Sequence, residues 1–303
     1  MLTSKAECRQ RFITEWILLV FAAKRGTLVS FTAHPKHVIV APMRMLCLLA
    51  VPAATLLAQI PAPNSAGVSM GHLHFVVPNP EVEKKLFIDL LGAEVTKTGS
   101  LELLRVPGIY IVVARANTPP AGGTNGSVVN HIGFEVKDFA GFKAKAMAAN
   151  VAWQELTPNV QAFVTLPDEI RLEIMENKDL STPVAFHHIH ESVTDQKAGL
   201  AWYLKEFGAK EGSRRNTGVA LIPGGEVDYL RAQMAQAPTK GRSLDHIGFE
   251  IKNLKEYCDK LKADGVPFDL EYREMPQLGG LKIAFVLDPN GTRIELTEGL
   301  AGK

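Results

Sequence analysis

Histidines recur at a nearly constant interval along most of the chain. The 303 residues include nine histidines, and the seven that follow residue 70 all fall in four short segments of similar sequence. The key histidine of each segment lies 59, 57 or 58 residues after the previous one; these are His72, His131, His188 and His246. Imidazole is the commonest metal ligand in proteins and titrates near neutral pH. The pattern therefore indicates metal binding or acid–base chemistry.

Two glutamates accompany the histidines. Arg171-Leu-Glu173-Ile and Arg293-Ile-Glu295-Leu have the same pattern, and their alternation puts each glutamate on the face opposite its apolar neighbours. Each half of the chain thus offers two imidazoles and one carboxylate, first His72, His131 and Glu173, then His188, His246 and Glu295. This donor set suits a divalent metal and leaves positions open for water, substrate or dioxygen. A single such histidine would more often be a hydrogen-bonded polar residue, but four at one period favour a metal.

The elements around these residues repeat as well. In the second segment Ile132, Phe134 and Val136 alternate with polar positions, which predicts a strand with one buried face. A helical stretch and further short β-rich segments follow, as in residues 80–91, where a helix is predicted between Pro80 and Gly92. A period near 58 indicates an internal repeat. We therefore expect an α+β fold of four βαβββ units.

The four units are of two kinds. Units one and three carry His-x-His, and units two and four share His-Ile-Gly-Phe-Glu. One unit of about 58 residues buries too little surface to be stable alone. We expect each unit of the first kind to pair with the unit that follows it, which gives an N-terminal domain at 70–180 and a C-terminal domain at 185–300.

Residues 1–59 differ from the rest in composition. They hold seven basic and two acidic residues, so the formal net charge of +1 combines a +5 leader with a −4 body. Met43-Arg44-Met45 precedes an apolar run that ends near Leu57, an arrangement typical of a secretory signal peptide. We expect translation to begin at Met43 or Met45, a signal peptide at about 43–59, a flexible linker at 60–69, and an exported product. A retained membrane anchor, formed by residues 12–23 or by residues 45–57, is the alternative, although both of these apolar runs are short.

Composition excludes several classes of protein. The near-neutral charge argues against nucleic-acid binding. The three cysteines are too few for a disulfide scaffold, and only Cys258 lies outside the leader. No stable membrane insertion is expected after cleavage.

The repeat, the His-Ile-Gly-Phe-Glu segments and the stretch from Leu287-Asp-Pro-Asn-Gly to Glu295-Leu resemble the vicinal oxygen chelate (VOC) superfamily. That superfamily includes glyoxalase I, fosfomycin- and bleomycin-resistance proteins and extradiol dioxygenases. The resemblance covers about residues 70–300. It implies paired βαβββ modules that form two open barrels, each around a divalent metal (Fe, Mn, Zn, Ni or Co).

The resemblance also implies roles for particular residues. The usual ligands, a first-strand histidine and a last-strand glutamate, map to His188, His246 and Glu295, and the C-terminal half is the fuller match. Glyoxalase I-like sites add a second carboxylate, for which Asp228 is a candidate. Extradiol enzymes usually carry a histidine and a tyrosine before the Asp-Pro turn, but Phe285 stands at the tyrosine position.

Four more residues are candidates for contact with substrate. His74 and His190 lie two residues after a ligand on the same face, where general acid–base catalysis or a supporting contact is possible. Arg171 and Arg293 share the face of the glutamates and are candidates for binding an anionic substrate or for a structural salt bridge.

Three hypotheses follow. The first is an exported metal-dependent enzyme, a lyase or isomerase or an extradiol-type dioxygenase, that acts on a small oxygenated molecule chelated to the metal. The second is a small-molecule-binding protein of the resistance type without catalysis. The third is that one half is catalytic and the other is a structural vestige.

Overall fold

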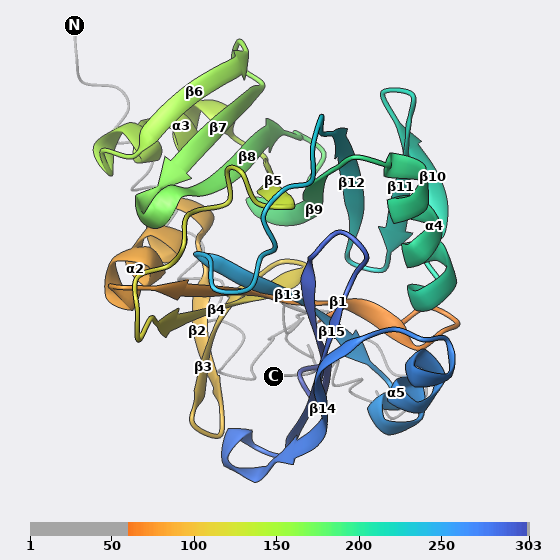
Figure 1. Cartoon of the computed structure of the whole chain (residues 1–303). Helices are drawn as coiled ribbons and strands as arrows, with labels where there is room; N and C mark the ends of the chain where they lie inside the picture. The colour runs from red at the N-terminus through yellow and green to blue at the C-terminus, as the bar shows by residue number, and fades with distance from the viewer. Residues whose placement is uncertain (1–59, 302–303) are drawn as a thin grey trace, which may run out of the picture. The chain divides into compact units, whose positions relative to one another are not determined.

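The computed structural model describes residues 60–301, which belong to one compact unit of the chain. The expected signal peptide and start codon lie outside these residues. The four expected βαβββ units are all present and confirm the fold class (Figure 1). Two short 3₁₀ turns, η1 (Pro167–Glu169) and η2 (Pro276–Leu278), lie within units two and four.

The first two units have the following bounds: β1 (Val68–Val77), α2 (Pro80–Leu91), β2 (Glu94–Thr98), β3 (Leu101–Val106) and β4 (Ile109–Arg115); then β5 (Val129–Val136), α3 (Phe139–Ala148), β6 (Ala152–Thr157), β7 (Gln161–Leu166) and β8 (Ile170–Glu176). The last two units are β9 (Val184–Val193), α4 (Gln196–Phe207), β10 (Lys210–Arg214), β11 (Thr217–Ile222) and β12 (Gly225–Arg231); then β13 (Leu244–Ile251), α5 (Leu254–Ala263), β14 (Phe268–Met275), β15 (Leu281–Leu287) and β16 (Arg293–Glu298).

The strands form two eight-stranded sheets. One has the order β14-β15-β16-β13-β1-β4-β3-β2 and joins units one and four; we call it the 1–4 sheet. The other has the order β10-β11-β12-β9-β5-β8-β7-β6 and joins units two and three; we call it the 2–3 sheet. At the centre of each sheet the first strands of two units pair antiparallel, β1 with β13 and β5 with β9.

This topology corrects the expected pairing within the domains 70–180 and 185–300. Unit one pairs with unit four, and unit three pairs with unit two. Units two and four share the same strand pattern, so either could complete unit one, and the repeat alone cannot decide between them. The connection from β8 to β9 spans only residues 177–183, and such short connections favour adjacent strands. The two ends of the described chain consequently meet in one sheet.

Helices cover the apolar face of each sheet, and the histidines lie on the other face. Phe75 of β1 packs against Phe87 of α2 with ring centroids 5.2 Å apart, and Phe207 of α4 lies 4.8 Å from Phe249 of β13. Because side chains alternate along a strand, His72 points away from the helix that Phe75 contacts. Burial of each of these rings contributes about 2 kcal/mol.

Helix ends follow the expected chemistry in part, since Asn79, which precedes α2, makes no side-chain cap hydrogen bond. The helix predicted between Pro80 and Gly92 is confirmed, and Gly92 adopts the left-handed conformation (φ 66°), with its N–H donated to the last turn. The side chains of Asp138 and Asp195 cap α3 and α4 by accepting backbone N–H groups.

The expected linker at 60–69 is partly wrong. Val68 and Ser69 already belong to β1. Asn64 donates its side-chain amide to the carbonyls of Phe207 (2.9 Å) and Gly208 (3.1 Å). Asn64 therefore anchors this segment to the C-terminal end of α4.

Among residues 60–301, no helix is long and apolar enough to cross a membrane.

Candidate metal centres

Each sheet gathers three histidines and one glutamate at a single point. In the 1–4 sheet these are His72, His74, His246 and Glu295, which we call the 1–4 cluster. One ligand atom from each lies within 4.8 Å of the others. The Nε2 atoms of His72 and His246 are both 2.9 Å from Oε2 of Glu295.

The 2–3 sheet holds the matching group, His131, Glu173, His188 and His190, which we call the 2–3 cluster. The Nε2 atoms of His131 and His188 are both 3.1 Å from Oε2 of Glu173. The same two nitrogens lie 3.4 Å from each other. All three side chains are buried.

These separations fit a shared metal ion. Metal–ligand bonds of about 2.1 Å imply separations of roughly 3.0–3.4 Å between neighbouring ligand atoms in octahedral or tetrahedral geometry. The 2–3 cluster shows 3.1 and 3.4 Å, and the 1–4 cluster is slightly tighter at 2.9 Å. Two imidazoles and one carboxylate are also a common donor set for divalent first-row metals. Both clusters are therefore able to hold such an ion.

The set His188, His246 and Glu295 taken from the resemblance does not come together. His188 lies with His131 and Glu173 in one sheet, while His246 and Glu295 lie with His72 in the other. The division by halves of the chain fails because each cluster combines residues from both halves. All six metal-ligand candidates nevertheless lie in one cluster or the other.

A residue before the histidine orients one ligand in each cluster. Nδ1 of His246 lies 2.7 Å from Oδ1 of Asp245, and Nδ1 of His131 lies 2.9 Å from Oδ1 of Asn130. A partner at Nδ1 fixes the tautomer that leaves the Nε2 lone pair available for a metal. Sequence reasoning missed both residues, although each directly precedes the key histidine of its unit.

The two candidate substrate arginines support these orienting residues instead. Arg293 donates to Asp245 and to Asp269, both at 2.7 Å, and its guanidinium lies over the ring of Phe285. Arg171 donates to Asn130 at 3.2 Å and lies over the ring of Phe163. Their contacts match the structural alternative rather than the binding of an anionic substrate.

Two glycines make room for the opposing imidazoles. A Cβ atom on Gly133 would lie 2.1 Å from Cε1 of His188, and one on Gly248 would lie 2.1 Å from Cε1 of His72. The strand register places these residues opposite one another. The glycine of His-Ile-Gly-Phe-Glu is therefore required for space.

The carboxylates of the clusters stay ionised. Burial alone would raise the pKa of Glu173, but hydrogen bonds from His131 and His188 outweigh it and hold the pKa far below its usual range. The same balance, with His246 and His72, lowers the pKa of Glu295. Burial lowers the pKa of His131 and of His188. Neutral imidazole and ionised carboxylate are the forms that bind metal.

The second histidines lie beside the ligands. Nδ1 of His190 is 3.0 Å from Nε2 of His131, and the ring of His74 lies 4.3 Å from that of His246 between centroids. Burial lowers the pKa of both rings, that of His190 to about 2. His187 lies beside the ligand His188, with 2.9 Å between their Nδ1 atoms, and its Nε2 accepts from Arg214 at 2.8 Å.

The space around the two clusters differs. The 2–3 cluster borders a cavity of about 150 Å³, which we call the 2–3 cavity. Glu173, His188 and His190 line it together with polar side chains (Gln161, Arg214, Arg215, Thr217, Asp228 and Tyr229) and three apolar ones (Met175, Val219 and Leu230). The 1–4 sheet instead packs apolar side chains on the corresponding face: Leu103, Tyr110, Val112, Ile283, Phe285 and Leu300. Sequence reasoning missed Gln161, Arg214 and Arg215, which belong to no repeated motif.

The position of Glu250 in the motif suggests an exposed residue at the rim of the site, but the structure shows otherwise. It is buried, and its Oε1 accepts the backbone N–H groups of Gly299 (2.8 Å), Leu300 (3.0 Å) and Ala301 (3.2 Å).

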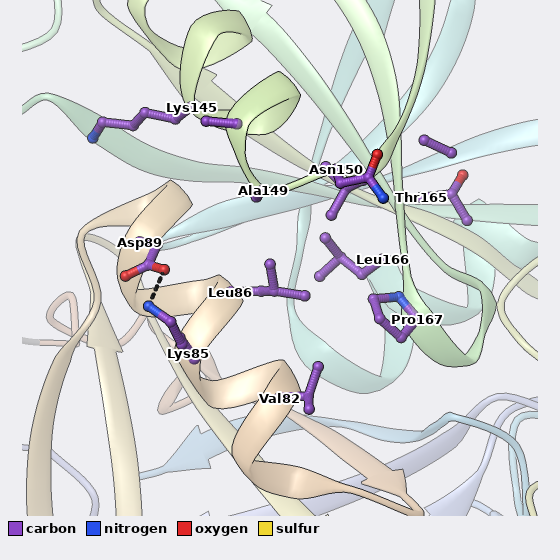
Figure 2. A pocket seen from close by; sticks show the side chains of 13 residues that line it. Val82, Lys85, Leu86, Asp89, Lys145, Ala149, Asn150, Thr165, Leu166 and Pro167 are labelled. Atoms are coloured by element: carbon purple, nitrogen blue, oxygen red, sulfur yellow. Dashed lines mark hydrogen bonds and ion pairs between the residues drawn. The ribbon is translucent and has the colours of Figure 1, made fainter.

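A larger groove lies away from both clusters. It has a volume of about 880 Å³ and runs between α2, the end of α3 and the end of β7 (Figure 2). Val82, Leu86 and Leu166 line it, and Lys85 pairs with Asp89 at its edge. It contains no residue of either cluster, so we place the candidate chemistry in the smaller cavity.

Comparison with known families confirms the resemblance seen in the sequence. Residues 185–296 match the model of the Glyoxalase/Bleomycin resistance protein/Dioxygenase superfamily. The matched stretch contains units three and four, which lie in different sheets. No curated protein matches the chain.

Similar solved structures extend the fold assignment to most of the described residues. Glyoxalase I from Zea mays is 13% identical with a TM-score of 0.59, and the match covers 76% of this chain and 92% of that one. A putative dioxygenase from Bacillus subtilis is 16% identical with a TM-score of 0.57, and covers 77% and 87%. At these identities the likeness establishes the shared fold and nothing about the reaction.

Proposed function

We propose that the protein is a metal-dependent enzyme of the vicinal oxygen chelate type and that the 2–3 cluster is its reactive centre. One observation carries the proposal: His131, His188 and Glu173 converge on one point, and His188 and Glu173 line a cavity large enough for a small molecule. When bound, a divalent metal would act as a Lewis acid on the neighbouring oxygens of a chelated substrate.

The protein's own residues supply the rest of the chemistry. His190 lines the 2–3 cavity beside the ligands, where it is placed to accept a proton from a bound substrate. His74 has the same position in the 1–4 cluster but faces apolar surroundings. We propose that the 1–4 cluster also binds a metal and that its role is structural.

Asp228 bears on the type of reaction. It pairs with His190 in the parallel register of β12 and β9, and it lines the 2–3 cavity. Its Oδ1 atom is buried and has no hydrogen-bond partner among the described residues. We propose that Asp228 is the second carboxylate of a glyoxalase I-like site, an assignment that favours isomerase or lyase chemistry over the three-ligand dioxygenase site.

Metal analysis and paired activity assays test the proposal. Protein loaded with metal should isomerise thiol hemiacetals of small aldehydes, and Glu173→Gln should lose both that activity and one equivalent of metal. Oxygen consumption with catechols would instead support the dioxygenase. Ligand binding without turnover of either substrate class would support the small-molecule-binding alternative.

We further propose that residues 43–59 direct export of the protein. The basic start and short apolar run support this, and residues 60–301 contain no helix able to span a membrane. N-terminal sequencing of the native protein should find a chain that starts near residue 60. A mature chain that starts before residue 43 would contradict the proposal.

A further inference from the structure

The 2–3 cavity contains one cation that no carboxylate neutralises. Arg214 forms ion pairs with Glu226 and with Asp228, the latter at 3.2 Å between Nε and Oδ2. Arg215 also lines the cavity, yet it forms no ion pair with any carboxylate of residues 60–301. Its guanidinium contacts Oε1 of Gln161 at 3.5 Å.

A tight hairpin fixes the position of Arg215. Arg214 pairs with Thr217, so Arg215 and Asn216 form the two-residue turn between β10 and β11. Both have positive φ angles, 46° and 66°, as a type I′ turn requires. Such a turn has little freedom, and it holds the base of the Arg215 side chain at the edge of the cavity.

Arg215 is also close to the proposed metal centre. Gln161, which its guanidinium contacts, donates its side-chain amide to Oε1 of Glu173. One side chain therefore separates the guanidinium from a proposed metal ligand. A group bound to Arg215 would lie within one small molecule's length of the metal.

The polar lining is specific to this sheet. By strand register, Arg215 corresponds to Gly99 in the turn between β2 and β3, and Asp228 corresponds to Val112 opposite His74. Gln161, two residues before Phe163, corresponds to Ile283, two residues before Phe285. The equivalent positions are therefore polar or charged in the 2–3 sheet and apolar or small in the 1–4 sheet. Only the 2–3 cavity suits a charged ligand.

We propose that Arg215 binds an anionic group of the substrate, so that the enzyme acts on a small acid that carries two neighbouring oxygens. This inference rests on the proposed function. Arg214 and Arg215 face Glu173, Asp228 and Glu226, and a divalent ion would add two positive charges and make the net charge of this group positive. A negatively charged substrate would offset part of that excess.

Two metal-chelating probes that differ by one carboxylate test the proposal. Acetohydroxamate offers only the chelating oxygens, and succinate monohydroxamate adds a carboxylate on a short chain. Calorimetric titration of the metal-loaded protein should show tighter binding of the acidic probe. Arg215→Gln should weaken that probe roughly tenfold, leave acetohydroxamate unchanged, and keep the full metal content. Arg215→Lys should retain part of the preference.

The control is Arg273→Gln, which removes the same charge from an exposed position on β14. It should leave both affinities unchanged. Equal probe preference in wild type and Arg215→Gln would overturn the role of Arg215 while leaving the metal centre intact. Metal-loaded wild-type protein that binds neither probe would overturn the proposed function itself, and with it this inference.

Discussion

Gly133 and His188 face each other across the central strand pair of the 2–3 sheet, and the imidazole occupies the space where a Cβ atom of residue 133 would lie. The clearance would be 2.1 Å to Cε1. Gly133 belongs to unit two and His188 to unit three. This contact explains why the motif carries a glycine where a strand would otherwise favour a side chain.

Replacement of Gly133 by alanine should displace the His188 ring. We expect Gly133→Ala to lose one equivalent of metal and to be destabilised by about 1–3 kcal/mol, the usual cost of overpacking. Metal content by mass spectrometry and urea unfolding measure the two effects.

Gly248→Ala is the matched control, since Gly248 makes the same contact with His72. It should remove metal from the 1–4 cluster and spare turnover at the 2–3 cluster. Turnover lost in Gly248→Ala but retained in Gly133→Ala would show that the reactive centre has been assigned to the wrong sheet.

The sequence predicts the units and their polar faces but not how the units pair. Strand alternation identifies the faces that carry His72, His131 and the other ligands, because alternation is a local property. Pairing depends on which of two nearly identical units meets a given strand, and the repeat makes both choices equally good. The contact between Gly133 and His188 depends on which units pair. It therefore cannot be predicted from the spacing of the histidines.

The lining of the cavity was also beyond sequence reasoning. Arg215 lies in a hairpin turn whose counterpart in unit one carries Gly99, and Gln161 lies at a strand start. Their approach to Glu173 follows from the curvature and register of the whole sheet. Asn130 and Asp245, in contrast, were detectable, because each precedes the key histidine of its unit.

Asp245 should raise the metal affinity of the 1–4 cluster by orienting His246. Asp245→Asn keeps the shape but weakens the carboxylate–imidazole contact of 2.7 Å. We expect a 10- to 100-fold loss of metal affinity at that cluster, measured by competition with a chelator. An unchanged affinity would mean that Asp245 does not orient the ligand. Asn130, which already carries an amide at this position, provides the internal comparison.

Glu83 should make the protein less stable as pH rises. Its side chain is buried, both carboxylate oxygens lack hydrogen-bond partners among the described residues, and burial, together with the nearby Asp168, raises its pKa to about 8. Between the unfolded pKa near 4.5 and this value, the folded chain holds one more proton than the unfolded chain. The free energy of unfolding therefore falls by about 1.4 kcal/mol per pH unit over that window.

Glu83→Gln should remove this dependence, because glutamine has no proton to lose. Urea unfolding at pH 5, 7 and 9 should show the variant gaining stability relative to wild type as pH rises. A constant difference between the two proteins across this range would contradict the account of Glu83.

Asn64 should stabilise the start of β1. Its amide donates to two carbonyls at the end of α4, and its Oδ1 accepts the N–H groups of Ala66 (2.9 Å) and Val68 (3.1 Å). Asn64→Ala should cost about 1–2 kcal/mol, since its partly buried partners lose their hydrogen bonds. Thermal unfolding of the two proteins would show it, and an unchanged midpoint would indicate that residues 60–67 act only as a tether.

The pairing of the ligands across the two halves is tested most directly by the metal content of two double variants. In the structure His131 and His188 share one cluster, whereas His188 and His246 belong to different clusters. His131→Ala with His188→Ala should therefore remove one equivalent of metal per chain, and His188→Ala with His246→Ala should remove two. The reverse result, two equivalents lost in the first variant and one in the second, would contradict the account.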